Sequence, residues 1–166
     1  LDAANGKSNG EPPAGLRTDL TERIGALQLR AQVAKEILAN LQHVEQVIDA
    51  FARDPAKRPT LAGLQPYLRQ MHGALSVLGF PGAAQAVSTC EGLVKAQASV
   101  DAAAEDVDWI AEALSSVGFF LEPCRHGREP GEEAIALFFR RYEKRNQPQT
   151  PDSTSTSRVR GTTQSC

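Results

Sequence analysis

The segment from Leu61 to Leu78 carries large apolar residues at steps of three, four, three, four and three. Such steps place side chains on one face of an α-helix, whereas a half-buried strand alternates with a period of two. No part of the chain alternates with period two over the length of a strand. The stripe consists of Leu61, Leu64, Leu68, Met71, Leu75 and Leu78. Gly79, a residue type common just after helices, follows it, so the pattern predicts a helix over 61–78.

A second apolar stripe precedes this one. Its members are Val33, Ile37, Leu41, Val44, Ile48 and Phe51. It ends at Asp54-Pro55, because proline disfavours the α conformation of the residue before it. The same spacing continues upstream through Leu16, Leu20, Ile24 and Leu27. These residues would extend the helix toward the N-terminus, although Gly25 disfavours a helix there.

Three further helices are predicted downstream. Pro81 suits the first turn of a helix that ends before the Ala/Asp-rich connection at 96–106. Asp106 is a good N-cap for the next helix, which Pro123 ends. A last helix opens at Glu129-Pro130, with Glu132 and Glu133 in a first turn that favours acidic groups. Their apolar faces are Ala83, Val87, Cys90 and Val94; Val107, Ile110, Leu114, Val117 and Leu121; and Ile135, Phe138, Phe139 and Tyr142.

The predicted fold class is therefore all-α, as an antiparallel helical bundle with a four-helix core and one additional helix over residues 16–145. Residues 1–15 hold one large apolar side chain among Gly, Pro, Asn and Ser, and we expect a flexible linker. Residues 146–166 are dominated by Ser, Thr and Gln, and we expect a disordered tail.

Composition disfavours several classes of partner. The chain has 18 Lys+Arg against 20 Asp+Glu and 5% aromatic residues, unlike a nucleic-acid-binding domain. No apolar run reaches the roughly 20 residues that span a bilayer, so we expect no membrane partner and a cytoplasmic protein. Three Cys without CxxC spacing predict neither a disulfide framework nor a zinc site. We expect no metal, no cofactor and no catalytic activity from these residues, since no nucleotide-binding loop or catalytic set is present.

One flank of the predicted helix over 61–78 is polar. Gln65, Arg69, His72 and Ser76 lie about 70–130° from the core direction, and Gly73 lies nearly opposite the core. Glycine there costs up to about 1 kcal/mol relative to Ala. Its presence fits a backbone that something must approach closely, or a position that nothing selects against.

The residues from Arg69 to Phe80, with Glu91 after them, resemble the histidine phosphotransfer (HPt) domain of chemotaxis-type histidine kinases. The family pattern is H-x-x-K-G, then Gly-Phe ten residues after the His, then a Glu twenty-two residues after it. Gly73, Gly79, Phe80 and Glu91 keep these offsets if Arg69 stands at the position of the phosphoaccepting His and His72 at that of the Lys. The wider chain, about 32–127, is similar to the HPt-like modules of Chp/Pil-type hybrid kinases that control type IV pili.

The resemblance implies a domain that is degenerate at the phosphoacceptor. A guanidinium stays protonated and offers only donors, so Arg69 cannot attack a phosphoryl group. His72 lies one turn further along and about 60° around the helix. Glu91 is either a group that fixes the tautomer of an acceptor, whose client His is missing, or a solvated or ion-paired helix residue.

Three functions therefore stay open at the level of sequence. The favoured one is a scaffold module that binds a response-regulator receiver or kinase domain of a chemotaxis-type phosphorelay, without carrying phosphate. Its contact residues would be Gln65, Arg69, His72, Gly73 and Ser76. The second is a genuine phosphotransfer domain with His72 as phosphoacceptor. The third is a structural helical bundle unrelated to a phosphorelay. The parent chain of the first two would be a histidine kinase or a free-standing scaffold.

Overall fold

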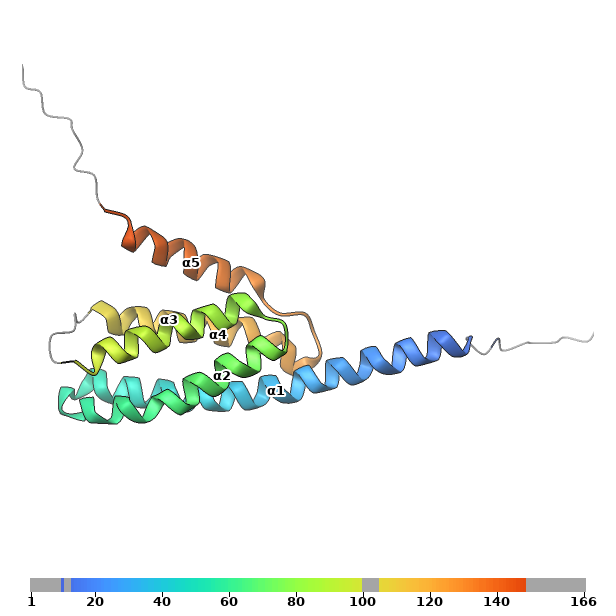
Figure 1. Cartoon of the computed structure of the whole chain (residues 1–166), viewed down its shortest axis with the longest axis horizontal. Helices are drawn as coiled ribbons and strands as arrows, with labels where there is room; N and C mark the ends of the chain where they lie inside the picture. The colour runs from blue at the N-terminus through green and yellow to red at the C-terminus, as the bar shows by residue number, and fades with distance from the viewer. Residues whose placement is uncertain (1–9, 11–12, 100–104, 149–166) are drawn as a thin grey trace, which may run out of the picture.

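The computed structural model describes Gly10 and residues 13–99 and 105–148. These residues form five α-helices and two 3-10 helices, and no strand is present among them. The predicted linker over 1–15 and tail over 146–166 lie almost entirely outside the described residues, apart from Gly10, residues 13–15 at the start of the first helix and residues 146–148. The all-α prediction is confirmed (Figure 1).

The first helix, α1 (Ala14–Arg53), is 40 residues long and continues through Gly25. The predicted upstream extension is therefore confirmed. Only its second half enters the core, through Ala34, Ile37, Leu41, Val44, Ile48 and Phe51. The first half projects beyond the other helices (Figure 1).

The segment predicted as one helix over 61–78 is divided. A 3-10 helix, η1 (Pro55–Leu64), precedes α2 (Gln65–Val77), so Leu61 and Leu64 lie in η1. The prediction was wrong at this end because Pro59 and Pro66 remove backbone donors on either side of the junction. Both leucines are still buried, at 0% and 1% exposure, since their side chains reach the same core.

The remaining helices are α3 (Pro81–Gln97), α4 (Glu105–Leu121), the 3-10 helix η2 (Glu122–His126) and α5 (Glu132–Asn146). Helices α1 to α4 pack in cyclic order, so α2 and α4 lie at diagonal corners, and α5 packs outside against α4 and α3. The largest fully buried side chains of the core include Leu68, Met71, Leu75, Ile110, Leu114 and Phe138.

Asp106 does not cap α4. It lies inside the helix, and its carboxylate accepts a hydrogen bond from Nη2 of Arg145 at the end of α5. The Arg145 guanidinium also lies 5.7 Å from the ring centroid of Trp109 and 5.8 Å from that of Tyr142. A second ion pair joins Arg141 to Glu112 at 2.7 Å. The predicted capping role is wrong because a residue 39 positions away supplies a better partner for this carboxylate.

Candidate functional site

The α2 helix ends in a turn built by Gly79 and Phe80. Gly79 has a φ of +78°, which residues with a side chain rarely adopt. Its N–H donates to the carbonyl of Ser76 at 3.1 Å, and the Phe80 N–H donates to the carbonyl of Leu75 at 2.9 Å, the two bonds of a Schellman motif. Phe80 is buried and packs edge-on against Phe120 at 5.1 Å between centroids. The Gly-Phe pair thus fixes how α3 leaves α2.

The five residues named as partner-binding in the sequence define what we call the α2 face: Gln65, Arg69, His72, Gly73 and Ser76. Arg69, His72, Gly73 and Ser76 are exposed, and Gln65 is partly buried. A Cβ on Gly73 would have no atom within 4 Å, so the space above it is open. Nothing in the described part of the chain therefore requires glycine at this position.

One hydrogen bond of the α2 face is internal to it. The Ser76 hydroxyl donates to the backbone carbonyl of His72 at 2.8 Å. Among the described residues, no group hydrogen-bonds or ion-pairs with the His72 imidazole, and Oε1 of Gln65 is buried without a hydrogen-bond partner. The imidazole is thus available to a partner from outside.

An ion cluster joins α2 to α3 beside this face. Nε of Arg69 lies 3.4 Å from Oε1 of Glu91, and Nζ of Lys95 lies 3.0 Å from the same oxygen. The Glu91 side chain is only 16% exposed, against 69% for Arg69. Hydrogen bonds from Lys95 first and Arg69 second, with the charges of both cations, lower the pKa of the Glu91 carboxyl. Glu91 therefore stays ionised and holds the two cations.

This cluster limits the chemistry of the α2 face. Arg69 and Glu91, 22 residues apart, meet across the two helices. Arg69 offers hydrogen-bond donors only, so the pair contains no nucleophile. Two cations against one carboxylate leave one excess positive charge, which suits contact with an acidic surface. Lys95 was missed in the sequence, although its i,i+4 spacing from Glu91 was a usable signal.

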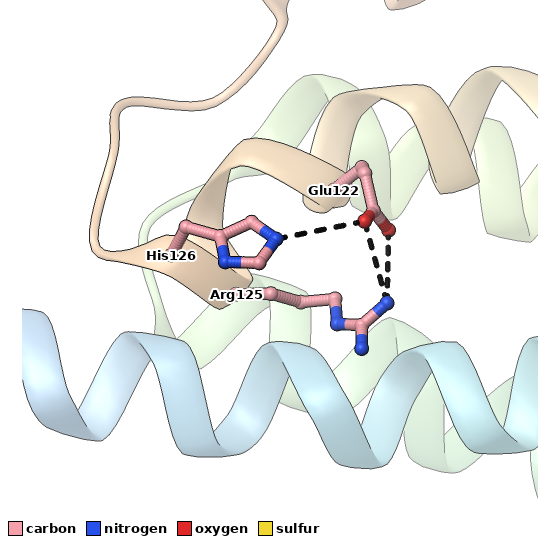
Figure 2. Close-up of polar contacts among 3 residues, drawn as sticks. All are labelled: Glu122, Arg125 and His126. Carbon is pink, nitrogen blue, oxygen red and sulfur yellow. Dashed lines mark hydrogen bonds and ion pairs between the residues drawn. The ribbon is translucent and has the colours of Figure 1, made fainter.

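A second polar cluster lies on η2, next to α1 (Figure 2). Nη1 of Arg125 is 3.3 Å from both carboxylate oxygens of Glu122, and Nε2 of His126 is 3.9 Å from Oε1 of the same residue. All three side chains are well exposed. Exposed pairs of this kind stabilise a protein by about 0–1 kcal/mol. With no nucleophile beside the His, the cluster is a surface ion pair.

The described cysteines are buried and unreactive. Cys90 is 0% exposed and Cys124 is 2% exposed. Burial, with a smaller effect of the Glu91 charge, raises the pKa of the Cys90 thiol to about 12, and burial also raises that of Cys124. Thiolates are the reactive form, so neither residue is a nucleophile near neutral pH.

Within residues 13–99 and 105–148, no group of three or more His, Cys, Asp or Glu is placed to hold a metal ion. None of the helices in this part of the chain is both long enough and apolar enough to cross a membrane.

The sequence model of the FimL C-terminal domain matches residues 25–138. FimL is related to type IV pili and chemotaxis-type signalling. No curated protein and no solved structure matches the chain at a significant level. The matched range covers α1 from Gly25 through the core of α5, including the α2 face and the ion cluster with Glu91. With the match extending over more than half of its length, the chain belongs to the FimL C-terminal domain family.

Proposed function

We propose that this domain is an HPt-like interaction module that carries no phosphate and binds a receiver or kinase domain of a cytoplasmic chemotaxis-type system that controls type IV pili. The observation that carries the proposal is the pairing of Arg69 with Glu91 across α2 and α3. A cation that cannot act as a nucleophile occupies the position where the HPt resemblance expects the acceptor. The family match supports the link to pilus signalling.

The α2 face has the properties of a docking surface. Arg69 and His72 are exposed, Gly73 leaves open space above the helix, and the neighbouring ion cluster has an excess positive charge. Interfaces favour Arg at their centres, and positive surfaces accelerate association with acidic partners. A helix of a partner can approach closely over Gly73, because no side chain intervenes.

Binding is tested with two matched glycine variants. Gly73→Leu places a bulky side chain on the α2 face, and Gly25→Leu places the same side chain at an equally open helical position on α1. With isolated receiver domains titrated by calorimetry, we expect Gly73→Leu to weaken binding at least about tenfold, or about 1.4 kcal/mol. Gly25→Leu should leave the affinity unchanged. Equal affinity of the wild type and both variants would remove the α2 face as the binding site.

Phosphorylation is tested with a chemotaxis-type kinase and ATP, using an authentic HPt domain as positive control. The wild type should take up no acid-labile phosphate. Arg69→His should create an acceptor, and Arg69→His with His72→Lys should accept more, because Lys stays protonated at neutral pH and His largely does not. If neither variant is labelled while the control is, the placement of Arg69 at the acceptor position fails.

A second candidate is an active phosphotransfer domain that uses His72. The observation in its favour is the exposed imidazole, which has no partner among the described residues. A neutral imidazole nitrogen is a competent nucleophile toward phosphoryl groups. Labelling of the wild type that disappears in His72→Ala would establish this candidate and exclude the non-phosphorylated scaffold.

A further inference from the structure

A groove runs along the bundle between α1 and α4. Its central part encloses about 320 Å³ and has a largely apolar floor. Further hollows continue the groove in both directions along α1. Each hollow has at least one lining residue in common with the next one, among them Leu38, Glu45, Val107 and Ser115. The floor is formed by Leu38, Ile48, Ala52, Ala111, Leu114 and Gly118. The groove follows α1 over about four turns, the length of a helical segment rather than of a small ligand.

Small side chains on α4 create this groove. Ala111, Ser115 and Gly118 follow one another at steps of four and three, so they form one stripe along the helix. A Cβ on Gly118 would lie 3.6 Å from Cδ2 of Leu41, an ordinary contact with α1. Phe119 stands at the edge with 71% of its surface exposed. The small side chains of this stripe leave the space that forms the groove. The exposed ring of Phe119 forms an apolar wall at its edge.

The central part of the groove is acidic, since Glu45 and Asp49 on α1 and Asp108 on α4 line it without a basic residue. Toward its ends the groove is also lined by Glu122 and by the cations Lys35, Arg125 and Arg58. Asp49 is paired with Arg53, and Glu122 with Arg125 (Figure 2). In the described residues no cation lies within ion-pair distance of Glu45 or Asp108. Partial burial raises the pKa of the Glu45 carboxyl, so a cation brought near it would be favoured.

The projecting half of α1 has the complementary character. Leu16, Leu20 and Ile24 are 48%, 48% and 56% exposed and form a stripe along residues 14–31. Arg17 and Arg23 flank this stripe on its two sides, and Arg23 also forms an exposed ion pair with Asp19 at 3.8 Å. The projecting half is therefore an amphipathic helix with basic flanks and no apolar partner among the described residues.

The stripe and the groove lie on the same side of α1. At about 100° per residue, 18 residues make five full turns, so residues 18 apart point in one direction. Leu20 thus points to the same side as Leu38, and Leu27 to the same side as Glu45. Ile24 likewise matches Gln42, another residue of the groove wall. Two copies of α1 laid side by side in opposite directions bring each stripe to the other copy's groove.

We propose that two copies of this chain associate through α1 as a two-fold antiparallel pair, with the projecting half of each α1 seated in the α1–α4 groove of the other. With the symmetry axis near Ala34, Leu20 of one copy faces Ile48 of the other, and Arg23 faces Glu45. Ala31 lies close to where the two helices cross, and its small side chain permits a close approach. Such a contact is self-complementary, as two-fold symmetry requires.

The pair leaves the α2 face accessible. Helix α2 lies at the corner of the bundle diagonal to α4, and it takes no part in the groove. A dimer formed in this way would present two α2 faces. The dimer and the binding proposed for the α2 face can therefore fail independently of each other.

The test is the oligomeric state of the full chain by sedimentation equilibrium over a micromolar to millimolar range. The wild type should dimerise. Leu20→Asp with Ile24→Asp should raise the dissociation constant at least about 100-fold, because each substitution acts twice in a two-fold pair. Leu29→Asp is the matched control, since Leu29 is 61% exposed on the opposite side of the same helical segment, and it should leave the dimer unchanged.

Two further variants test the groove itself. Ala111→Trp fills its floor and should also raise the dissociation constant at least about tenfold. Arg23→Glu and Glu45→Arg should each weaken the dimer, and their combination in one chain should restore it. A wild type that stays monomeric at millimolar concentration overturns the proposal. So does a dimer that Ala111→Trp leaves intact, because the stripes would then pair with each other outside the groove.

Discussion

The two halves of α1 have the same spacing of apolar residues and different surroundings. The six core residues of the second half are at most 5% exposed, whereas Leu16, Leu20 and Ile24 in the first half are about half exposed. Both halves are helical, and the helix does not break at Gly25 within the first half. Periodicity therefore predicts helix and the direction of its apolar face, but burial depends on whether other helices stand opposite that face.

Hydrogen exchange should show the largest difference between the halves. In the monomer, amides over 34–51 open only by global unfolding, whereas those over 14–31 open locally because no buried side chain holds them. For a domain stability of about 5 kcal/mol or more, the protection factors should differ by at least about 10³. Mass spectrometry with peptides from each half measures this. Equal protection at a concentration where the chain is monomeric would contradict the comparison.

The next largest effect is expected when one leucine in each half of α1 is truncated to alanine. Leu41→Ala should lower the free energy of unfolding by about 2–5 kcal/mol, because Leu41 is 5% exposed in the core. Leu68→Ala and Leu75→Ala, both at 0% exposure, should do the same. Leu20→Ala should change it by less than about 0.5 kcal/mol in the monomer. Urea denaturation followed by circular dichroism gives these values, and a loss above 1 kcal/mol for Leu20→Ala would place that side chain in the core.

Glycine to alanine substitutions compare the projecting half of α1 with the bundle through smaller changes in the free energy of unfolding. Both Gly25 and Gly73 are helical, with no atom within 4 Å of an added Cβ. Gly73→Ala should raise the free energy of unfolding by about 0.5–1 kcal/mol, since α2 belongs to the core. Gly25→Ala should increase the helical signal of α1 without moving the denaturation midpoint. A shift of equal size in both variants would show that the projecting half unfolds together with the bundle.

Ion pairs give the smallest expected effects. Asp19→Asn removes an exposed pair with Arg23 at 3.8 Å on the projecting half and should leave stability unchanged. Glu91→Gln should destabilise the domain at neutral pH by about 1 kcal/mol or less. The pKa of Glu91 is lowered in the folded state, so its contribution is present above about pH 4.5 and is lost as pH falls through the folded pKa. Denaturation of wild type and Glu91→Gln should therefore converge in acid, and a difference that grows there would reverse the sign of the shift.

The helices could be predicted from the sequence because each stripe repeats at three and four residues. The split of the stripe from Leu61 to Leu78 could not, since 3-10 and α segments both bury residues at these steps and Pro59 and Pro66 decide between them. The role of Asp106 also escaped prediction. Its local sequence suits an N-cap, but Arg145, 39 residues later, binds the carboxylate.

The candidate site and the groove also contain one feature that the sequence predicts and one that it does not. The meeting of Arg69 with Glu91 follows from a helical hairpin closed at Gly79-Phe80, which the sequence indicates. The α1–α4 groove depends on how far apart two helices of distant sequence lie. The small residues Ala111, Ser115 and Gly118 are a signal for close packing as much as for a groove, so only the structure distinguishes the two.

The contacts of Arg145 with Asp106 and Trp109 on α4 allow the attachment of α5 to be followed by fluorescence. The chain contains a single tryptophan, Trp109, and its ring lies under the Arg145 guanidinium and edge-on to Tyr142, 5.5 Å between centroids. Both partners belong to α5, and the indole is itself only partly buried. Release of α5 would expose this indole to water, so its fluorescence would report the attachment of one helix without any added label.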